Sequence, residues 1–206
     1  MKNIKTYFNN NIFSWICIGV ILSIMIISIF HSLHHSWESD ENKYIEKYYQ
    51  TEVATNISAH GLRKKINEWD NSFVLVDVRS EEEYLEWHII WAISIPAYTD
   101  RDNTQNISNE RILNSFKEIP EDKEIITYCY SAYCMSSRKI GKFLAEEWVY
   151  VKHLTVGWNE WRYGWELWNY PHEADETEKY IANWAEPGKL EWAGSDSCGI
   201  SGDFGC

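Results

Sequence analysis

The sequence predicts a three-layer α/β domain, in which a central parallel sheet is flanked by helices, preceded by one transmembrane helix. Short apolar runs at residues 73–78 and 124–128 alternate with segments of helical periodicity, and such runs are typical of parallel strands buried on both faces. A long stretch near the N-terminus carries no charge. The length of 206 residues accommodates one ordinary globular domain with appendages.

The uncharged stretch covers residues 12–30, which read IFSWICIGVILSIMIISIF, and as a helix it would span roughly the hydrocarbon core of a bilayer. A cleaved signal peptide is the competing interpretation, but its apolar region would be shorter and followed by an A-x-A-like site. We therefore interpret residues 1–31 as an uncleaved single-pass anchor. Lys2 and Lys5 precede the span and acidic residues follow it, so the positive-inside rule predicts a cytoplasmic N-terminus and an extracytoplasmic domain.

The domain is expected at residues 53–170, after a polar and charged linker at 32–52 that shows no clear periodicity. Ser58 can cap a helix whose apolar residues share one face, namely Leu62, Ile66 and Trp69. The first strand follows this helix. Ser80 and Glu83 then form a capping box for a short second helix.

The second half of the domain continues the alternation of strands and helices. A strand is expected at residues 93–95, and Ser108 can cap a helix that carries Ile112, Leu113 and Phe116. After the strand at 124–128, the series ends with a helix at 136–147, the segment 151–155 and a Trp-rich helix near 157–165. This order favours a parallel sheet covered on both faces.

Residues 171–206 turn acidic and then Gly-rich, and we interpret them as a tail with little core of its own. Cys198 and Cys206 lie in this tail, where they either join in a small loop or stay exposed without function. A third cysteine, Cys17, lies in the apolar N-terminal stretch.

Composition and charge exclude several classes of function. The net charge of −12, with no local cluster of Lys and Arg, argues against nucleic acid as a partner. The five cysteines include no CxxC pair of the kind that builds zinc sites. No metal and no cofactor are therefore expected.

Cys129 is the candidate for chemistry because of its position. It lies where the strand 124–128 ends and a loop leads into a helix, and ligands of open α/β sheets bind outside the carboxyl ends of the strands. Loop N–H groups and the positive end of the helix can surround the sulfur and lower the pKa of the thiol. On position alone, a buried structural cysteine is an equal alternative.

Three motifs resemble the rhodanese family. VLVDVRSEEEYLEWHIIWAISIP (74–96) is similar to the first rhodanese signature, with seven residues in register: Asp77, Arg79, Glu83, Tyr84, His88, Ala92 and Pro96. YCYSAYCMSSRKIGKFL (128–144) resembles the catalytic loop and the helix after it, and HLTVGWNEW (153–161) resembles the closing segment. Together the motifs indicate a rhodanese-like domain over roughly residues 53–170.

The resemblance implies a sulfurtransferase or persulfide carrier in which Cys129 accepts sulfane sulfur as a persulfide. Its partners would be a small sulfane-sulfur donor and a thiol or cyanide acceptor, with no protein partner indicated. The substrate-binding loop would consist of Tyr130, Ser131, Ala132, Tyr133, Cys134 and Met135. For Asp77, Arg79 and His88 we expect a structural role, because charged residues at a strand end most often fix the neighbouring turn.

The loop departs from the family pattern in two ways. Many rhodanese loops carry a basic residue that holds an anionic donor, whereas here no charge follows Cys129 until Arg138, which argues against thiosulfate as the donor. The loop also offers a second thiol, Cys134, as in a subset of rhodanese-like loops. This thiol either resolves a persulfide into a disulfide or serves loop packing alone.

Three other functions compete with sulfur transfer. A non-catalytic binding module would keep the fold and present the loop to a partner, and an inert Cys129 thiol would favour it. A thiol redox switch would use Cys129 and Cys134. A phosphatase of the related fold needs a Cys-x5-Arg loop, and Met135 occupies the position of the expected arginine, so this alternative is the weakest.

Twelve tryptophans are unusually many for this length. Trp87, Trp91 and Trp148 fall where the family pattern has glycine, and Trp69 is a further candidate. Glycine at such turns supplies a positive φ or a close backbone approach. The alternatives are an aromatic-rich variant that repacks, or a stop codon that the source organism reads as glycine.

Overall fold

The computed structural model describes residues 2–102 and 107–190, without the side chains of residues 2–13 and 35–40. The chain divides into two compact units, residues 1–52 and 53–206. Helix α1 (Lys2–Thr55) makes up the first unit, apart from its residues 53–55, which belong to the second unit. The helix continues through the segment 32–52 that lacks clear periodicity in the sequence. Its part Ser14–His34 is 21 residues long and apolar enough to cross a membrane.

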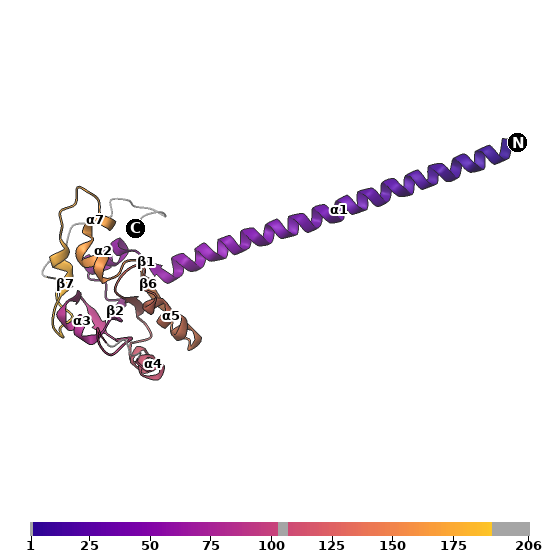
Figure 1. The fold of residues 1–206 in the computed structure, drawn as a ribbon. Helices are drawn as coiled ribbons and strands as arrows, with labels where there is room; N and C mark the ends of the chain where they lie inside the picture. Colours follow the sequence, from indigo (N-terminus) through magenta and orange to yellow (C-terminus); the bar gives the residue numbers. More distant parts are fainter. Residues whose placement is uncertain (1, 103–106, 191–206) are drawn as a thin grey trace. The chain divides into compact units, whose positions relative to one another are not determined.

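The second unit is built on a five-stranded parallel sheet, as the sequence predicts (Figure 1). In spatial order the strands are β1 (Asn56–Ile57), β6 (Val151–Leu154), β5 (Glu124–Tyr128), β2 (Phe73–Asp77) and β4 (Ala92–Ser94). Every neighbouring pair in this sheet is parallel. Two further strands, β3 (His88–Ile89) and β7 (Ile181–Ala182), pair antiparallel in a small second sheet.

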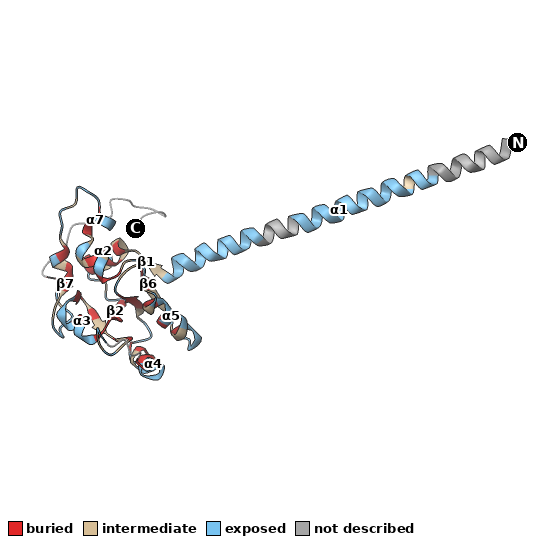
Figure 2. Ribbon diagram, in the orientation of Figure 1, coloured by how far each residue is buried: buried red, intermediate tan, exposed pale blue. Residues whose placement is uncertain are grey.

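Helices cover both faces of the large sheet, and the expected three layers are confirmed (Figure 2). Successive strand residues alternate between faces, so that Leu75 joins one core cluster and Val76 the other. The first cluster includes residues of α2 (Ala59–Asn67), α3 (Glu81–Glu86), α6 (Trp158–Tyr163) and α7 (Trp165–Trp168). The second includes residues of α4 (Asn109–Lys117) and α5 (Ser136–Glu146).

The three predicted helix caps are confirmed. The hydroxyl oxygen of Ser58 accepts a hydrogen bond from the Gly61 amide at 2.9 Å, and the Ser108 hydroxyl accepts one from the Arg111 amide. Ser80 and Glu83 form the capping box that begins α3. These side chains satisfy amides that have no partner inside their own helix, so a local sequence signal fixes where each helix begins.

The segment after Pro171 differs from the expected tail, because residues 171–190 contribute to the core. A 3₁₀ turn, η1 (Thr177–Tyr180), precedes β7, and Tyr180 and Leu190 are buried in the first core cluster. The indole N–H of Trp161 donates to the backbone oxygen of Tyr180 at 3.3 Å. The prediction was wrong here because β7 pairs with a strand about ninety residues earlier in the sequence, and no local periodicity signals such a pairing.

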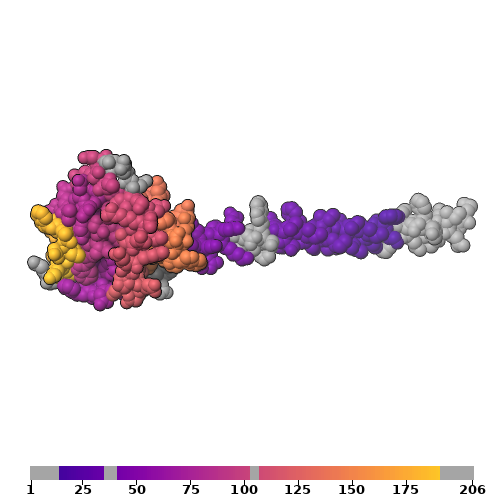
Figure 3. Space-filling view, turned by 90° about the horizontal axis from the view of Figure 1, so that it is seen from below, coloured from indigo at the N-terminus to yellow at the C-terminus, as the bar shows by residue number. Residues whose placement is uncertain are grey.

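Residues 191–206, with Cys198 and Cys206, lie outside the described residues. The space-filling view shows one face of the second unit (Figure 3). On this face the segment that carries α4, in pink, lies against the magenta segment that precedes it in the chain.

Candidate active site

Cys129 directly follows β5 at the carboxyl end of the sheet, and its side chain is 1% exposed. The first turn of α6 holds the backbone that follows the Cys129 Cα atom. The Trp158 amide donates to the backbone oxygen of Cys129 and the Asn159 amide to that of Tyr130, both at 2.8 Å. The loop 129–135 is therefore fixed at its start by a helix that lies some thirty residues later in the sequence.

A disulfide joins Cys129 to Cys134, with 6.3 Å between the two Cα atoms. The loop turns back on itself to bring the sulfurs together, and the Cys134 amide donates to the backbone oxygen of Ser131 at 3.0 Å. Cys134 is partly exposed, whereas Cys129 is buried. Tyr133 is 90% exposed, so this outer part of the loop is the part that solvent and small thiols reach first.

Two residues that the sequence analysis did not single out fix the shape of this loop. Gly157 lies so close that a Cβ atom on it would be 2.2 Å from the Ser131 Cα. The Oε2 atom of Glu160 accepts hydrogen bonds from the Gly157 amide at 2.9 Å and from the Ala132 amide at 3.1 Å. Both residues lie within the motif HLTVGWNEW, and only the fold brings them to the loop.

Arg138 supports the loop from the opposite end. One terminal nitrogen, Nη1, donates to the backbone oxygens of Ala132 at 3.0 Å and of Cys134 at 3.1 Å. The guanidinium group thus binds loop carbonyls, which positions the peptide around Cys134.

Helix α5 begins at Ser136, immediately after the loop, and Met135 at its N-cap position makes no side-chain capping hydrogen bond. The amides of a first helical turn have no partner within the helix and carry a partial positive charge. A thiolate or persulfide on the preceding loop is stabilised by such a helix end.

Asp77, Arg79 and Tyr128 form a buried network at the carboxyl ends of β2 and β5. The Tyr128 hydroxyl and Arg79 Nη2 each donate to Asp77 Oδ2 at 2.6 Å, and Arg79 Nη2 also donates to the backbone oxygen of Trp87 at 2.7 Å. Burial opposes the charge on Arg79, but the negative charge of Asp77, the hydrogen bond to it and the neighbouring Tyr128 and Glu83 together outweigh burial and raise the pKa of the guanidinium. This geometry supports a structural role for the acid and the base.

His88 is also enclosed by structural contacts. Its side chain is buried, stacks on Tyr84 and places Nδ1 at 2.7 Å from the Tyr84 backbone oxygen. Nε2 lies 3.1 Å from the backbone oxygen of Glu186, in the segment that the sequence analysis assigned to the tail. Burial lowers the pKa of this imidazole. These contacts link α3 and the start of β3 to the C-terminal part of the domain.

A cavity of about 160 Å³ opens beside Tyr130. Its two arginines are each paired with a carboxylate, Arg79 with Asp77 and Arg101 with Glu86. The other lining residues are Glu83, Trp87, Trp158, Asn159 and Tyr163. Burial alone would raise the pKa of Glu83, but hydrogen bonds from Tyr130 and Ser80 lower it, so this carboxyl is charged. Carboxylates thus offset the positive charge of both arginines, and the cavity is poorly suited to binding a small dianion.

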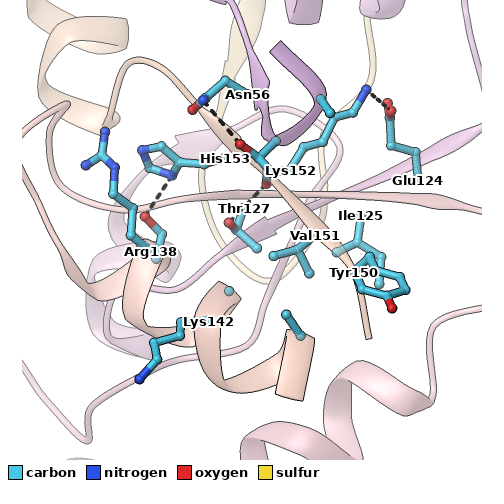
Figure 4. Close-up of a pocket in the computed structure, with 15 residues that line it drawn as sticks. Asn56, Glu124, Ile125, Thr127, Arg138, Lys142, Tyr150, Val151, Lys152 and His153 are labelled. Carbon is cyan, nitrogen blue, oxygen red and sulfur yellow. Dashed lines mark hydrogen bonds and ion pairs between the residues drawn. The ribbon is translucent and has the colours of Figure 1, made fainter. Parts of the chain in front are cut away.

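A larger cavity of about 710 Å³ lies between α5 and the strands β1, β5 and β6 (Figure 4). Ser137 and His153 line it, with 2.9 Å between the serine oxygen and Nδ1 of the imidazole. Burial lowers the pKa of His153 to about 4, so the ring is neutral at neutral pH. Neither cysteine of the loop lines this cavity, although Arg138, which binds the loop carbonyls, is among its lining residues.

Comparisons with known proteins place these features in context. A family model described as "Rhodanese-like domain" matches residues 58–163. The HTH-type transcriptional regulator Rv0324 of Mycobacterium tuberculosis is 33% identical over 88 residues, which are 43% of this chain and 34% of the relative. The match thus spans about a third of that relative's length.

Two solved structures are among those that match this chain. The BH2092 protein from Bacillus halodurans is 24% identical with a TM-score of 0.51, and the match covers 73% of this chain and 93% of that one. A rhodanese-related protein from Thermoplasma volcanium is 20% identical with a TM-score of 0.39, over 56% of this chain and 94% of that one.

Proposed function

The chain belongs to the rhodanese-like domain family, and on this premise we propose that it is a membrane-anchored sulfurtransferase that carries sulfane sulfur on Cys129. The observation that carries the proposal is the pair Cys129 and Cys134 in one loop, at the carboxyl end of β5 and before a helix without a side-chain cap. That position combines a nucleophile, stabilisation of its anion and a second thiol within bonding distance.

In the loading step, the Cys129 thiolate attacks the terminal sulfur of a persulfide donor. A new S–S bond forms to Cys129, the S–S bond of the donor breaks, and the donor thiolate leaves with the electron pair. We propose small persulfides and polysulfides as donors in place of thiosulfate. The side chains of residues 130–135 carry no charge, and both arginines of the adjoining cavity already have carboxylate partners.

The persulfide on Cys129 then reacts in one of two ways. An external thiolate attacks the outer sulfur, takes it and returns the Cys129 thiolate. Alternatively, the Cys134 thiolate attacks the Cys129 Sγ atom, which expels hydrosulfide and forms the Cys129–Cys134 disulfide. An external dithiol reduces that disulfide and becomes a disulfide itself. We propose that it attacks Cys134, because this sulfur is the more accessible of the two.

Replacing Cys134 with serine tests the second reaction, in which Cys134 displaces hydrosulfide. We expect Cys134→Ser to keep the persulfide on Cys129 and to release much less sulfide, because the internal thiolate is gone. Intact mass and sulfide release are measured over time after loading with inorganic polysulfide. Cys17→Ser removes a thiol that lies in α1 and is the matched control, which should behave as the unaltered chain. Equal sulfide release from Cys134→Ser and the control would assign Cys134 to packing alone.

We also propose that α1 anchors the domain on the extracytoplasmic side of a membrane. The apolar part Ser14–His34 supports the anchor, and Lys2 and Lys5 before it support a cytoplasmic N-terminus. Protease added to sealed, right-side-out membrane vesicles should digest the domain, and inside-out vesicles should protect it. Digestion in the inside-out vesicles with protection in the others would reverse the orientation.

A thiol redox switch is the second candidate function, and the disulfide in the loop is the observation that favours it. Both candidates predict that a dithiol opens this bond. They differ in sulfur loading, since only a sulfurtransferase forms a persulfide on the reduced Cys129. Loading that fails while the disulfide still forms and opens reversibly would favour the switch.

A further inference from the structure

Four residues of the described chain other than glycine have a positive φ, and all four are tryptophan. Their φ angles are 54° for Trp69, 68° for Trp91, 63° for Trp148 and 66° for Trp184. In this left-handed region the Cβ atom approaches the following carbonyl oxygen, so the region favours glycine, with Asn and Asp as its usual substitutes. A bulky residue at such an angle is an outlier, and a set made only of the bulkiest residue calls for one common cause.

Two of the four residues occupy a position for which glycine is the usual residue. At the end of α5 the Trp148 amide donates to the Ala145 oxygen at 3.2 Å, and the Val149 amide donates to the Leu144 oxygen at 2.9 Å. This pair of bonds defines a Schellman motif, in which the residue at the position of Trp148 adopts the left-handed conformation.

The end of α2 repeats the same motif. The Trp69 amide donates to the Ile66 oxygen at 3.1 Å, and the Asp70 amide donates to the Lys65 oxygen at 2.9 Å. Two helices of different sequence therefore end in the same way, each with an indole where the motif ordinarily has no side chain.

The other two residues lie in tight backbone connections. Trp91 lies between β3 and β4, and its amide donates to the Pro187 oxygen at 2.5 Å. Trp184 follows β7, and its amide donates to the Leu85 oxygen at 2.8 Å. The backbone contacts hold both residues in their conformation, and the indole has no part in them.

The side chains of Trp148 and Trp184 contrast with the tryptophans of the core, whereas Trp91 packs against the first core cluster. Trp148 and Trp184 are 82% and 72% exposed, although indole is a large apolar group. Trp161 is 1% exposed, stacks on Trp168 and donates its indole N–H to a backbone oxygen. The core therefore requires Trp161, whereas the indoles of Trp148 and Trp184 lie mostly in solvent.

We propose that residues 69, 91, 148 and 184 are glycine in the organism that makes this protein, encoded by a UGA codon that this organism reads as glycine. A UGA codon differs from the tryptophan codon UGG in its last base alone, so one codon read in two ways accounts for all four positions. Trp184 is a new position, which was not suspected from the sequence. Trp87 has an extended backbone with φ of −161°, which any residue adopts, so its conformation does not require glycine.

The gene and the native protein test the proposal directly. We expect UGA codons at positions 69, 91, 148 and 184 and a UGG codon at Trp161, and peptides of the native protein should have the mass of glycine at those four positions. UGG codons at the four positions, or peptides that contain tryptophan there, would overturn the proposal.

A stability measurement tests the conformational argument. In the full chain we expect Trp148→Gly to raise the melting temperature above that of both the Trp148 chain and Trp148→Ala, because only glycine removes the Cβ atom. Trp161→Gly is the matched control and should lower the melting temperature strongly, since it empties a core position. A Trp148→Ala variant as stable as Trp148→Gly would show that φ at this position does not favour glycine.

Discussion

Cys129→Ser is expected to abolish sulfur loading and to leave the fold intact. A serine hydroxyl is nearly isosteric with the thiol, but it does not ionise near neutral pH and cannot carry a persulfide. The buried position has to accommodate the new hydroxyl, at a cost of roughly 1–3 kcal/mol in the free energy of unfolding. Intact mass after treatment with inorganic polysulfide measures loading, and circular dichroism checks the fold.

The control for this prediction is Cys17→Ser, which should load as the unaltered chain does because Cys17 lies in α1. The result that contradicts the assignment is a Cys129→Ser variant that still loads one sulfur on Cys134. That outcome would make Cys134 the accepting thiol and Cys129 its partner.

Gly157→Ala is expected to slow sulfur transfer by about 100-fold or more, because displacements of about 1 Å at a reacting group have effects of that size. An added Cβ atom would lie 2.2 Å from the Cα and the amide nitrogen of Ser131 and 2.5 Å from the carbonyl carbon of Tyr130. These are backbone atoms, so the loop that carries Cys129 must shift. The φ angle of −103° is open to alanine, so the expected effect is steric.

Gly141→Ala is the matched control for this prediction. Gly141 lies within α5, where an added Cβ atom would meet only the Val151 side chain at 3.2 Å, and alanine favours the helix by about 1 kcal/mol over glycine. Transfer rates are measured for both variants with the same donor and acceptor. If Gly157→Ala transfers sulfur as fast as Gly141→Ala, the contact between residue 157 and the loop is not important for catalysis.

The parts of the fold that local sequence signals determine were predictable. Ser58, Ser80 and Ser108 cap helices because a hydroxyl accepts from the amide three residues later. Strands buried on both faces follow from their continuous apolar runs. Residues 171–190 were assigned to a tail instead, because the pairing of Ile181 with Ile89 joins segments far apart in the sequence.

The candidate site shows the same division between local and distant contacts. The sequence placed Cys129 at the end of a strand. For Cys134 it left two roles open, resolution of a persulfide into a disulfide and packing of the loop. Glu160 and Gly157 were missed as loop contacts because the Glu160 carboxylate reaches Ala132 across 28 residues of sequence. A carboxylate three residues after the glycine that precedes α6 is the signal that could have found them, since this spacing fits a capping box.

The tryptophans with a positive φ could be predicted only in part. Trp69, Trp91 and Trp148 could be suspected from sequence because they lie at turns, and each has a positive φ. Trp184 was not suspected because it lies beyond the predicted end of the domain. Trp87 was suspected from the family pattern, and its extended backbone is open to any residue.

The central claim is that Cys129 carries sulfane sulfur, and intact-mass analysis of the full chain tests it most directly. The chain is reduced to open the Cys129–Cys134 disulfide, freed of reductant and treated with inorganic polysulfide. We predict the gain of one sulfur atom, mapped by peptide mass to Cys129 and lost again on addition of a thiol acceptor. A reduced chain that is folded by circular dichroism and yet stays without added sulfur, with polysulfide and with the persulfide of a small thiol, would contradict the claim and favour a binding module.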